Sequence, residues 1–435
     1  MKSLKFSEIF KLGAQLLTQL YTMEKRPYWS YEKIQNYQLK QLKLRLREAR
    51  DLVPMYKNKN LPAPDKINTL ADWSKIPLLT KDELLSYEPA MRINSHYQLD
   101  ELVVSKSSGS TGKSLDVYYN LESFNLFILA GLRLYKMAFN YRPWHRQTYI
   151  YTSPYPLNSL FGAYPLEFIS TLNPIEDTIE KLRRNPPALL VCYPSHLRSI
   201  ADKMTLEDFK VIRPKVINVN SEMSSPAERE YLGKIFGSFI FDDYSSEELT
   251  RIASQCQHLA YHIFDDINYI EIIDDHGNAV PDGVIGNIVG TNLHNQGMPL
   301  LRYMQGDRGA ISSRKCNCGR KFRILETLEG RRNDAFTLSN GETISSGLLL
   351  DLTYGVFLKY PGCVSAFCLI QEKPDEWYLE MVPGENWTEY LKKTISQELM
   401  KDLKRDQVKI ETRIVKDVTK TKSGKANPII SKIKK

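Results

Sequence analysis

Residues 147–241 alternate short apolar runs with longer amphipathic runs, and this alternation restricts the possible folds more than any other feature of the sequence. Short apolar runs between turn-forming residues are typical of buried strands, and apolar spacings of three and four are typical of helices. A chain that alternates the two favours a mostly parallel sheet with helices on its faces. The predicted strands are residues 149–151, 188–191, 216–219 and 239–241, and the predicted helices are residues 175–184, 196–204 and 226–236.

Two of these predicted strands are followed directly by polar side chains. In open parallel sheets, ligands bind beyond the carboxyl ends of the strands. Ser221 and Glu222 follow the strand at 216–219, and the segment Tyr244–Glu248 follows the strand at 239–241. The sequence therefore predicts that both segments contact a ligand.

The rest of the chain predicts additional domains. A length of 435 residues suggests about two or three domains rather than one core. Residues 269–273 and 286–290 alternate apolar and polar positions around a turn, which is typical of a β-subdomain. From about residue 335, strands and helices mix again over about 100 residues, enough for a small separate domain.

Composition excludes several classes of function. The net charge of +8 favours anionic ligands, but no dense basic patch with interleaved aromatic residues predicts a nucleic-acid partner. No run approaches the ~18 apolar residues of a transmembrane segment, so none is expected. Residues 4–20 fit an amphipathic helix, for which packing in the core or between domains is favoured over contact with a membrane surface.

A loop of glycine and hydroxyl residues lies between the apolar residues 102–104 and the alternating residues 115–118, which predicts a strand–loop–strand hairpin. Glycines let successive N–H groups turn inward around an anion, and hydroxyls and a lysine add donors. The loop is not a Walker loop, because Ser107 stands where the first glycine should be and a strand follows instead of a helix. The expected phosphate-binding residues are Ser107, Ser108, Gly109, Ser110, Thr111, Gly112 and Lys113.

Four residues from two parts of the chain could form a metal site. Cys316 and Cys318 are a close thiol pair on a glycine turn, as in zinc knuckles. Further ligands would be Cys256 with His258 or His262. From spacing alone, a zinc site and four polar residues that bind no metal are equally good interpretations. Six cysteines in 435 residues do not make a disulfide scaffold, which predicts a reducing, cytoplasmic location.

Five segments, in the expected order, resemble the motifs of the adenylate-forming superfamily. The resemblance covers residues from about 39 to 425. It implies an α/β fold with a large N-terminal adenylation domain, residues 1–333, which contains a mostly parallel sheet and a β-subdomain. A small mobile α+β domain, residues 334–435, would follow. The matching segments are residues 107–113, 244–248, 301–307, 330–334 and 419–425.

The resemblance also implies roles for single residues. Tyr244 would flank adenine, Glu248 would bind Mg²⁺ and take part in catalysis, and Asp307 would accept hydrogen bonds from the ribose hydroxyls. Arg331 would touch ribose or phosphate. Lys425 would be the catalytic lysine, carried by a mobile loop to stabilise charge on the α-phosphate. Further expected nucleotide contacts are Ser221, Glu222, Ser245 and Ser246.

Two positions depart from the family pattern. Glu247 stands where the family usually has serine or threonine, and Asn333 replaces an aspartate. These departures keep open a non-catalytic protein that only binds nucleotide. The presence of Lys425, Glu248 and Asp307 favours an enzyme.

Within the superfamily, the chain most resembles the phenylacetate-CoA ligase-like and CapK-like branch. Residues 76–78 and 193–195 also support this resemblance. Chains of this branch often carry a cysteine eight residues after the motif glutamate, then a histidine, then a C-x-C-G. The resemblance implies a structural Zn²⁺, because four protein ligands leave no open position. The implied ligands are Cys256, His262, Cys316 and Cys318.

The implied reaction is ATP-dependent activation of a carboxylic acid as acyl-AMP, followed by transfer to CoA, another thiol or an amine. No motif decides between these acceptors. A phosphotransferase that releases ADP is the other catalytic alternative. An aryl or arylacetic acid is the expected substrate class by family, with Tyr149, Tyr151, Tyr155 and Tyr164 as candidate pocket residues. A homodimer is a further expectation.

Overall fold

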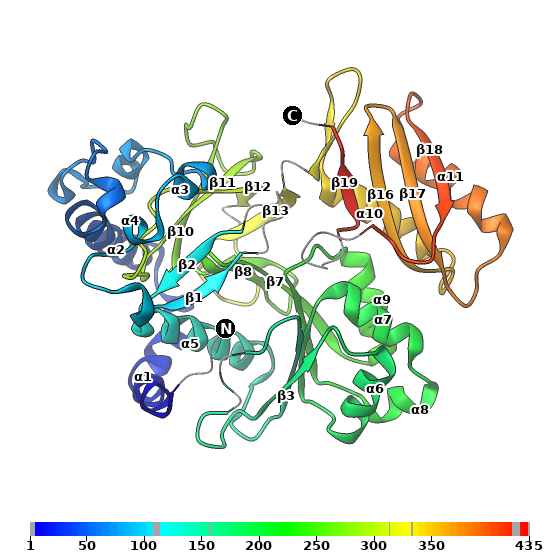
Figure 1. Cartoon of the computed structure of the whole chain (residues 1–435), viewed down its shortest axis with the longest axis horizontal. Coiled ribbons are helices and arrows are strands. Elements are labelled where there is room, and N and C mark those ends of the chain that lie inside the picture. The colour runs from blue at the N-terminus through cyan, green and yellow to red at the C-terminus, as the bar shows by residue number, and fades with distance from the viewer. Residues whose placement is uncertain are drawn as a thin grey trace. The chain divides into compact units, whose positions relative to one another are not determined.

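The computed structural model describes most of the chain, and its contacts divide it into two compact units (Figure 1). The first unit comprises Met1–His145, Ser153–Leu166 and Asp243–Leu328, and the second comprises Arg146–Thr152, Glu167–Asp242 and Glu329–Lys435. The described residues are 5–107, 114–155, 157, 159–312, 314–331, 334–419 and 427–433.

Helices make up most of the N-terminal part of the first unit. Ser30 caps the second helix, since its hydroxyl accepts a hydrogen bond from the Lys33 amide at 3.3 Å. That helix ends at Leu52, shortly before Pro54. In the helix Leu121–Phe139, most of the apolar side chains are buried in the core. The helices are α1 (Phe6–Lys25), α2 (Tyr31–Leu52), α3 (Lys81–Leu85), α4 (Pro89–Arg92) and α5 (Leu121–Phe139).

The strands of the first unit are mainly antiparallel. Strands β1 (Val103–Lys106) and β2 (Asp116–Tyr119) form the predicted hairpin. The other strands follow the order β10-β11-β12-β13-β9-β8-β7, which includes the expected β-subdomain. They are β7 (Phe239–Ser246), β8 (Thr250–Gln255), β9 (Tyr261–Ile263), β10 (Asn268–Ile273), β11 (Gly286–Asn292), β12 (Tyr303–Ser312) and β13 (Ile324–Arg331).

The prediction that a strand ends at Phe241 is wrong. Strand β7 continues to Ser246, because β8 pairs antiparallel with residues 243–246 and satisfies their backbone groups. The register shifts between Tyr244 and Ser245, which indicates a β-bulge. Residues 244–246 of the motif therefore lie on a bulged strand, and Glu247 and Glu248 lie in the turn that follows it.

The second unit contains the predicted parallel strands. Strands β3, β5 and β6 pair in parallel, in a sheet whose order runs β7-β6-β5-β3-β4. Helices α6 and α9 have the predicted bounds. The elements are β3 (Gln147–Tyr151), β4 (Leu166–Ser170), α6 (Ile175–Arg184), β5 (Leu189–Cys192), α7 (Pro194–Lys203), α8 (Leu206–Val211), β6 (Val216–Asn220) and α9 (Pro226–Phe236).

The last hundred residues of this unit have a sheet and an apolar core of their own. The sheet order is β18-β17-β16-β19, and most of the apolar core cluster comes from residues 336–429. The elements are β14 (Phe336–Thr337), β15 (Thr343–Ile344), α10 (Ser346–Phe357), β16 (Val364–Lys373), β17 (Glu376–Pro383), α11 (Glu389–Leu403), β18 (Lys409–Ile414) and β19 (Ile429–Ser431).

A buried carboxylate ties helices α1 and α5 to the strands of the first unit. Asp266 accepts two hydrogen bonds from the Arg133 guanidinium, at 2.6 and 2.9 Å, and one at 3.4 Å from Arg26, which directly follows α1. Burial opposes ionisation of Asp266, but Arg133 and Arg26 outweigh it and hold the pKa of Asp266 below its usual range.

We expect Asp266→Ala to destabilise the protein by about 3–5 kcal/mol, because it leaves a buried guanidinium unpaired. The pKa of Asp266 is lowered by folding, so this stabilisation is present above the unfolded pKa near ~3.9 and is lost as pH falls through the folded value. Urea denaturation at neutral pH measures the change. The matched control is Asp282→Ala, which removes an exposed carboxylate of the same unit. Equal unfolding midpoints for the two variants would contradict the assignment.

Candidate functional site

The hairpin β1–β2 holds the two ends of the glycine and hydroxyl loop together. The Ser107 amide donates to the Leu115 carbonyl at 2.9 Å, and the Ser107 hydroxyl accepts from the Leu115 amide at 2.9 Å. Lys81, at the start of α3, donates to the same hydroxyl at 3.3 Å. The predicted phosphate-binding residues 108–113 lie outside the described residues, whereas the base of the loop is closed and carries a positive charge.

Two of the predicted motifs meet through alternate residues of β12. The Tyr244 hydroxyl donates to the Asp307 carboxylate at 2.6 Å. Gln305 donates to the Ser246 hydroxyl at 2.7 Å, and the Tyr303 hydroxyl donates to Glu248 at 3.0 Å. Successive contacts are thus two residues apart in both segments, and the two segments run in opposite directions. The structure brings together Tyr244, Ser246, Glu248 and Asp307, which were predicted separately.

Glu248 lies at the buried end of this contact row. It is only 7% exposed, and the Tyr303 hydroxyl engages its Oε1 atom. Burial and the nearby Glu247 and Glu248 raise the pKa of Tyr119 well above its usual range, so this phenol remains a hydrogen-bond donor. Tyr119 donates to the Glu247 carbonyl oxygen.

Glu247, the first departure from the family pattern, is connected to the phosphate-loop hairpin. Its carboxylate accepts a hydrogen bond from the Ser105 hydroxyl on β1. Tyr119, on the partner strand β2, bonds to its carbonyl oxygen. The side chain that replaces the usual hydroxyl therefore links the 244–248 segment to the strand that enters the loop.

Arg302, within the predicted 301–307 motif, has a structural position. Its guanidinium donates to the carbonyls of Ser74 and Ile76 at 2.7 and 2.8 Å and to Glu271 at 3.2 Å. The residues that follow Ile76 lead directly into Lys81. Arg302 thus fixes the start of β12 next to the segment that supplies the lysine at the base of the loop.

Ser221, Glu222 and Arg331 lie in the second unit. Ser221 follows β6 with a positive φ of 67°, and Glu222 accepts a hydrogen bond from the Ser195 amide at 3.2 Å. Gly330, just before Arg331, also has a positive φ, and a Cβ there would lie 2.6 Å from the sulfur of Met223. Only glycine fits this position, so Gly330 holds the end of β13 against the segment 221–223.

The four candidate pocket tyrosines separate into two groups. Tyr149 and Tyr151 stack with centroids 4.0 Å apart in the second unit, and Tyr193 packs 4.4 Å from Tyr151. Tyr155 and Tyr164 instead lie in the first unit, where Tyr164 packs against Tyr141 at 5.3 Å. The stacked pair lies near the carboxyl end of a parallel strand.

We expect Asp307→Ala to raise the KM for ATP roughly 10- to 100-fold, which corresponds to the loss of a charge-assisted hydrogen bond to a ribose hydroxyl. Tyr244→Phe, which removes the hydroxyl that holds Asp307 at 2.6 Å, should have a smaller effect in the same direction. Initial rates over a range of ATP concentrations measure both variants. Unchanged KM in Asp307→Ala would contradict the ribose assignment.

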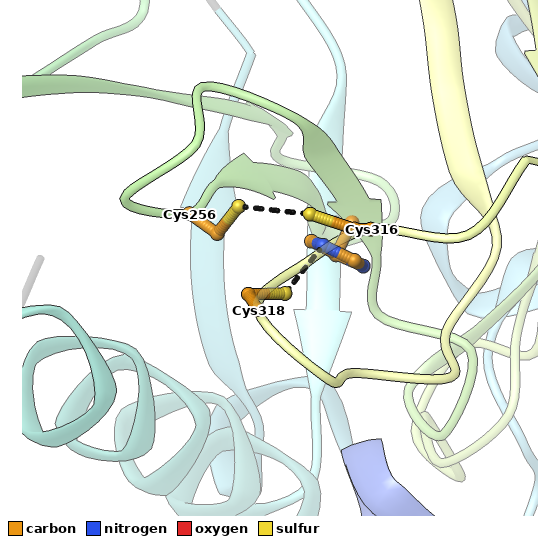
Figure 2. A group of neighbouring side chains, drawn as sticks. Cys256, Cys316 and Cys318 are labelled. Carbon is orange, nitrogen blue, oxygen red and sulfur yellow. Dashed lines mark hydrogen bonds between the residues drawn. The ribbon is translucent and has the colours of Figure 1, made fainter.

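The four predicted zinc ligands converge in the first unit, and we call them the Cys/His cluster. Figure 2 shows Cys256, Cys316 and Cys318 turned toward a common centre. The ligand atoms of these cysteines and His262 all lie within 4.8 Å of one another. The sulfurs of Cys256 and Cys316 are 3.6 Å apart, and Cys318 Sγ is 3.1 Å from His262 Nε2. Four converging S and N atoms could hold a zinc ion.

The surroundings of the Cys/His cluster suit a metal ligand set. His262 Nδ1 lies 3.2 Å from the Phe322 carbonyl, which makes Nδ1 the protonated nitrogen and leaves Nε2 free to coordinate. Burial lowers the pKa of His262 to about 4, so its ring is neutral at pH 7. His258, the alternative ligand, is exposed and stands outside the cluster, although its amide donates to Cys256 Sγ at 3.4 Å.

The sequence analysis missed several residues of the site. Tyr303 and Gln305 were overlooked, although their period-two spacing with Asp307 on a predicted turn could have indicated a strand. Lys81 and Tyr119 have no local sequence signal, because their contacts come from distant segments. Lys425, the expected catalytic lysine, and Asn333 lie outside the described residues.

Comparisons with known proteins agree with the fold. Residues 336–432 match the CapK C-terminal domain family. The chain is 24% identical over 321 residues to the phenylacetate-coenzyme A ligase of Pseudomonas putida, covering 70% of this chain and 72% of that protein. The corresponding enzyme of Aromatoleum evansii is 27% identical over 333 residues, with coverage of 70% and 72%.

Solved structures share the fold. The structure of 2-hydroxyisobutyryl-CoA ligase in the postadenylation state, in complex with 2-HIB-AMP, superposes with a TM-score of 0.78 at 19% identity, covering 94% of this chain and 91% of that one. The expected α/β fold class is confirmed. The chain is therefore similar to phenylacetate-CoA ligases over 70% of its length, and its residues 336–432 match the CapK C-terminal domain.

Proposed function

We propose that this protein activates a small carboxylic acid with ATP as acyl-AMP and transfers the acyl group to the thiol of CoA. The observation that carries the proposal is the row of contacts between the segment 244–248 and β12. That row holds the Tyr244 ring, the Asp307 carboxylate proposed to bind ribose, and the buried Glu248 carboxylate proposed to bind Mg²⁺. The similar structure of 2-hydroxyisobutyryl-CoA ligase is a complex with 2-HIB-AMP. An acyl-AMP is also the intermediate that we propose for this protein.

In the first step, a carboxylate oxygen of the acid attacks the α-phosphorus of ATP and the bond to the β-phosphate oxygen breaks. Acyl-AMP and pyrophosphate are the products. In this proposal Tyr244 flanks the adenine and Asp307 accepts from the ribose hydroxyls. Residues 107–113 donate to the phosphates, and Lys425 stabilises the negative charge that develops on the α-phosphate.

Glu248 is the residue proposed to hold Mg²⁺. Tyr303 engages one carboxylate oxygen, which fixes the orientation of the other for a cation. The ion would neutralise charge on the phosphates. Ser221, Glu222, Ser245, Ser246 and Arg331 are the remaining proposed nucleotide contacts.

The second step is attack by the acceptor on the acyl carbonyl carbon, with AMP as the leaving group. A CoA thiol gives a thioester, and an amine acceptor would give an amide by the same bond exchange. We propose residues 1–333 as the adenylation domain and residues 334–435 as a mobile domain that turns about Asp334. The separate apolar core formed largely by residues 336–429 supports this boundary.

We propose an aromatic acid as the substrate class. The stacked rings of Tyr149 and Tyr151 lie near the carboxyl end of β3, and Tyr193 packs beside them, so this face could receive a further ring. We also propose that the Cys/His cluster holds a structural Zn²⁺, which requires reduced thiols. A cytoplasmic location follows from this requirement and from the use of ATP and CoA.

The test is carboxylate-dependent exchange of labelled pyrophosphate into ATP over aryl, arylacetic, fatty, hydroxy and amino acids. Exchange that depends on one class of acid would support adenylation and identify the class. Chromatography of the nucleotide products separates AMP-forming chemistry from phosphotransfer, which releases ADP. CoA and amines are then compared as acceptors of the acyl group.

Protein that binds ATP but supports no exchange with any acid would contradict the proposal in favour of a non-catalytic nucleotide-binding protein. Amide formation without thioester formation would reject the thiol acceptor and retain the adenylation step.

A further inference from the structure

Helix α1 has two apolar faces, and the protein covers only one of them. Leu12, Leu20 and Met23 are buried on the side that packs against α5. This contact is specific: Asn125 of α5 donates to Gln15 at 2.6 Å, and Arg133 donates to the Met23 carbonyl at 3.1 Å. Figure 1 shows α1 (dark blue) next to α5. The helix is therefore held in one orientation by its inner face.

The second apolar face is a stripe exposed to solvent. Phe6, Phe10, Leu17 and Tyr21 are 76, 65, 81 and 66% exposed. Their spacings of four, seven and four residues place them in one line along the helix. Phe161, itself exposed, lies beside the start of this line, with its ring centroid 5.9 Å from that of Phe6. We call these five side chains the α1 stripe.

The charges on the exposed surface of α1 have one sign. Among its described exposed positions, the charged residues are Lys5, Lys11 and Lys25. Both acids of the helix are partly buried: Glu8 accepts from the Lys5 amide, and Glu24 pairs with Lys136 of α5. Lys25 lies with Nζ 4.0 Å from the centre of the Tyr21 ring. The apolar stripe and the lysines thus form one surface.

We propose that α1 binds to the surface of a membrane rich in anionic lipid, lying in the plane of the interface. Aromatic rings and leucine can enter the headgroup region while lysines contact anionic headgroups. The proposed contact is peripheral, because the inner face of α1 stays packed against α5. The described part of the chain contains no helix with the length and apolarity to cross a membrane. A second copy of the chain suits this surface less well, because it would bring lysines against lysines.

The experiment is co-sedimentation of the full chain with vesicles of phosphatidylcholine alone or mixed with phosphatidylglycerol. We expect binding to the mixed vesicles and weaker binding at high salt. The Phe10→Ser/Leu17→Ser variant should bind at least about tenfold more weakly. Each of Lys11→Gln and Lys25→Gln should reduce binding to mixed vesicles roughly fivefold. All of these substitutions are at exposed positions, so the unfolding temperatures of the variants should equal that of the parent protein.

The matched control is Leu206→Ser, which removes a leucine that is 82% exposed on α8, compared with 81% for Leu17. It should bind vesicles as the parent protein does. No binding to mixed vesicles, or equal binding by the stripe variant and the control, would overturn the proposal. Light scattering that finds a dimer which Phe10→Ser/Leu17→Ser dissociates would also overturn it, in favour of an interface between copies. None of these measurements depends on the ligase activity.

Discussion

Lys425→Ala is expected to lower the rate of acid-dependent ATP–pyrophosphate exchange by about 10²- to 10³-fold at saturating ATP, while ATP still binds. The lysine would act on charge that develops on the α-phosphate during attack, so its loss affects the transition state more than the bound substrate. In the proposed mechanism ATP is bound mainly through the contacts around Tyr244 and Asp307, which this substitution does not remove. The expected pattern is therefore a reduced kcat with little change in the Kd for ATP.

Lys422→Ala is the matched control, because it removes a lysine from the same short segment. It should retain exchange within about threefold of the parent rate, because the proposed mechanism gives this lysine no role in the reaction. Calorimetric titration with ATP separates binding from turnover for both variants. If Lys425→Ala exchanges pyrophosphate as fast as Lys422→Ala, the catalytic role of Lys425 is wrong.

Cys318→Ser is expected to lose bound zinc and to destabilise the first unit by more than about 3 kcal/mol. The free energy of binding a structural zinc ion contributes directly to folding, and a site with three ligands binds the ion much more weakly. Removal of zinc from the parent protein with a strong chelator should lower the unfolding temperature in the same way. Metal analysis of purified protein should find close to one zinc per chain.

His258→Ala is the control for this experiment, since His258 lies near the cluster but outside it. This variant should keep its zinc, whereas His262→Ala should lose it. Well under one zinc per chain in the parent protein would contradict the zinc assignment. Loss of metal from His258→Ala but not from His262→Ala would mean that the fourth ligand was chosen wrongly.

The local patterns of the sequence predict most of the architecture. Helices α6 and α9 have the bounds that apolar spacing and capping residues indicate, and the hairpin around the glycine loop follows from period-two alternation. One element that departs from the prediction is β7, whose extension to Ser246 depends on pairing with β8. Pairing between strands is a tertiary interaction, and a single segment contains no signal for it.

The candidate site also has a part that the sequence predicts and a part that it does not. Tyr244, Glu248 and Asp307 could be named from short motifs, because each motif is continuous in sequence. Their connection through Tyr303 and Gln305 could not, since it depends on the register between β12 and the segment 244–248. The same holds for Glu247. The sequence shows that a glutamate departs from the family pattern there, but its hydrogen bond with Ser105 can be seen only in the structure.

The positions of the Cys/His cluster in the chain have a consequence for biosynthesis. Cys256 and Cys316 are 60 residues apart, and strands β9, β10, β11 and β12 lie between them. A zinc ion bound there would close a loop that contains Tyr303, Gln305 and Asp307. The ion cannot bind all four ligands until Cys318 has been synthesised. The loop that carries Tyr303, Gln305 and Asp307 would therefore be fixed only after zinc has bound. The yield of active protein would then follow the zinc supply of the cell.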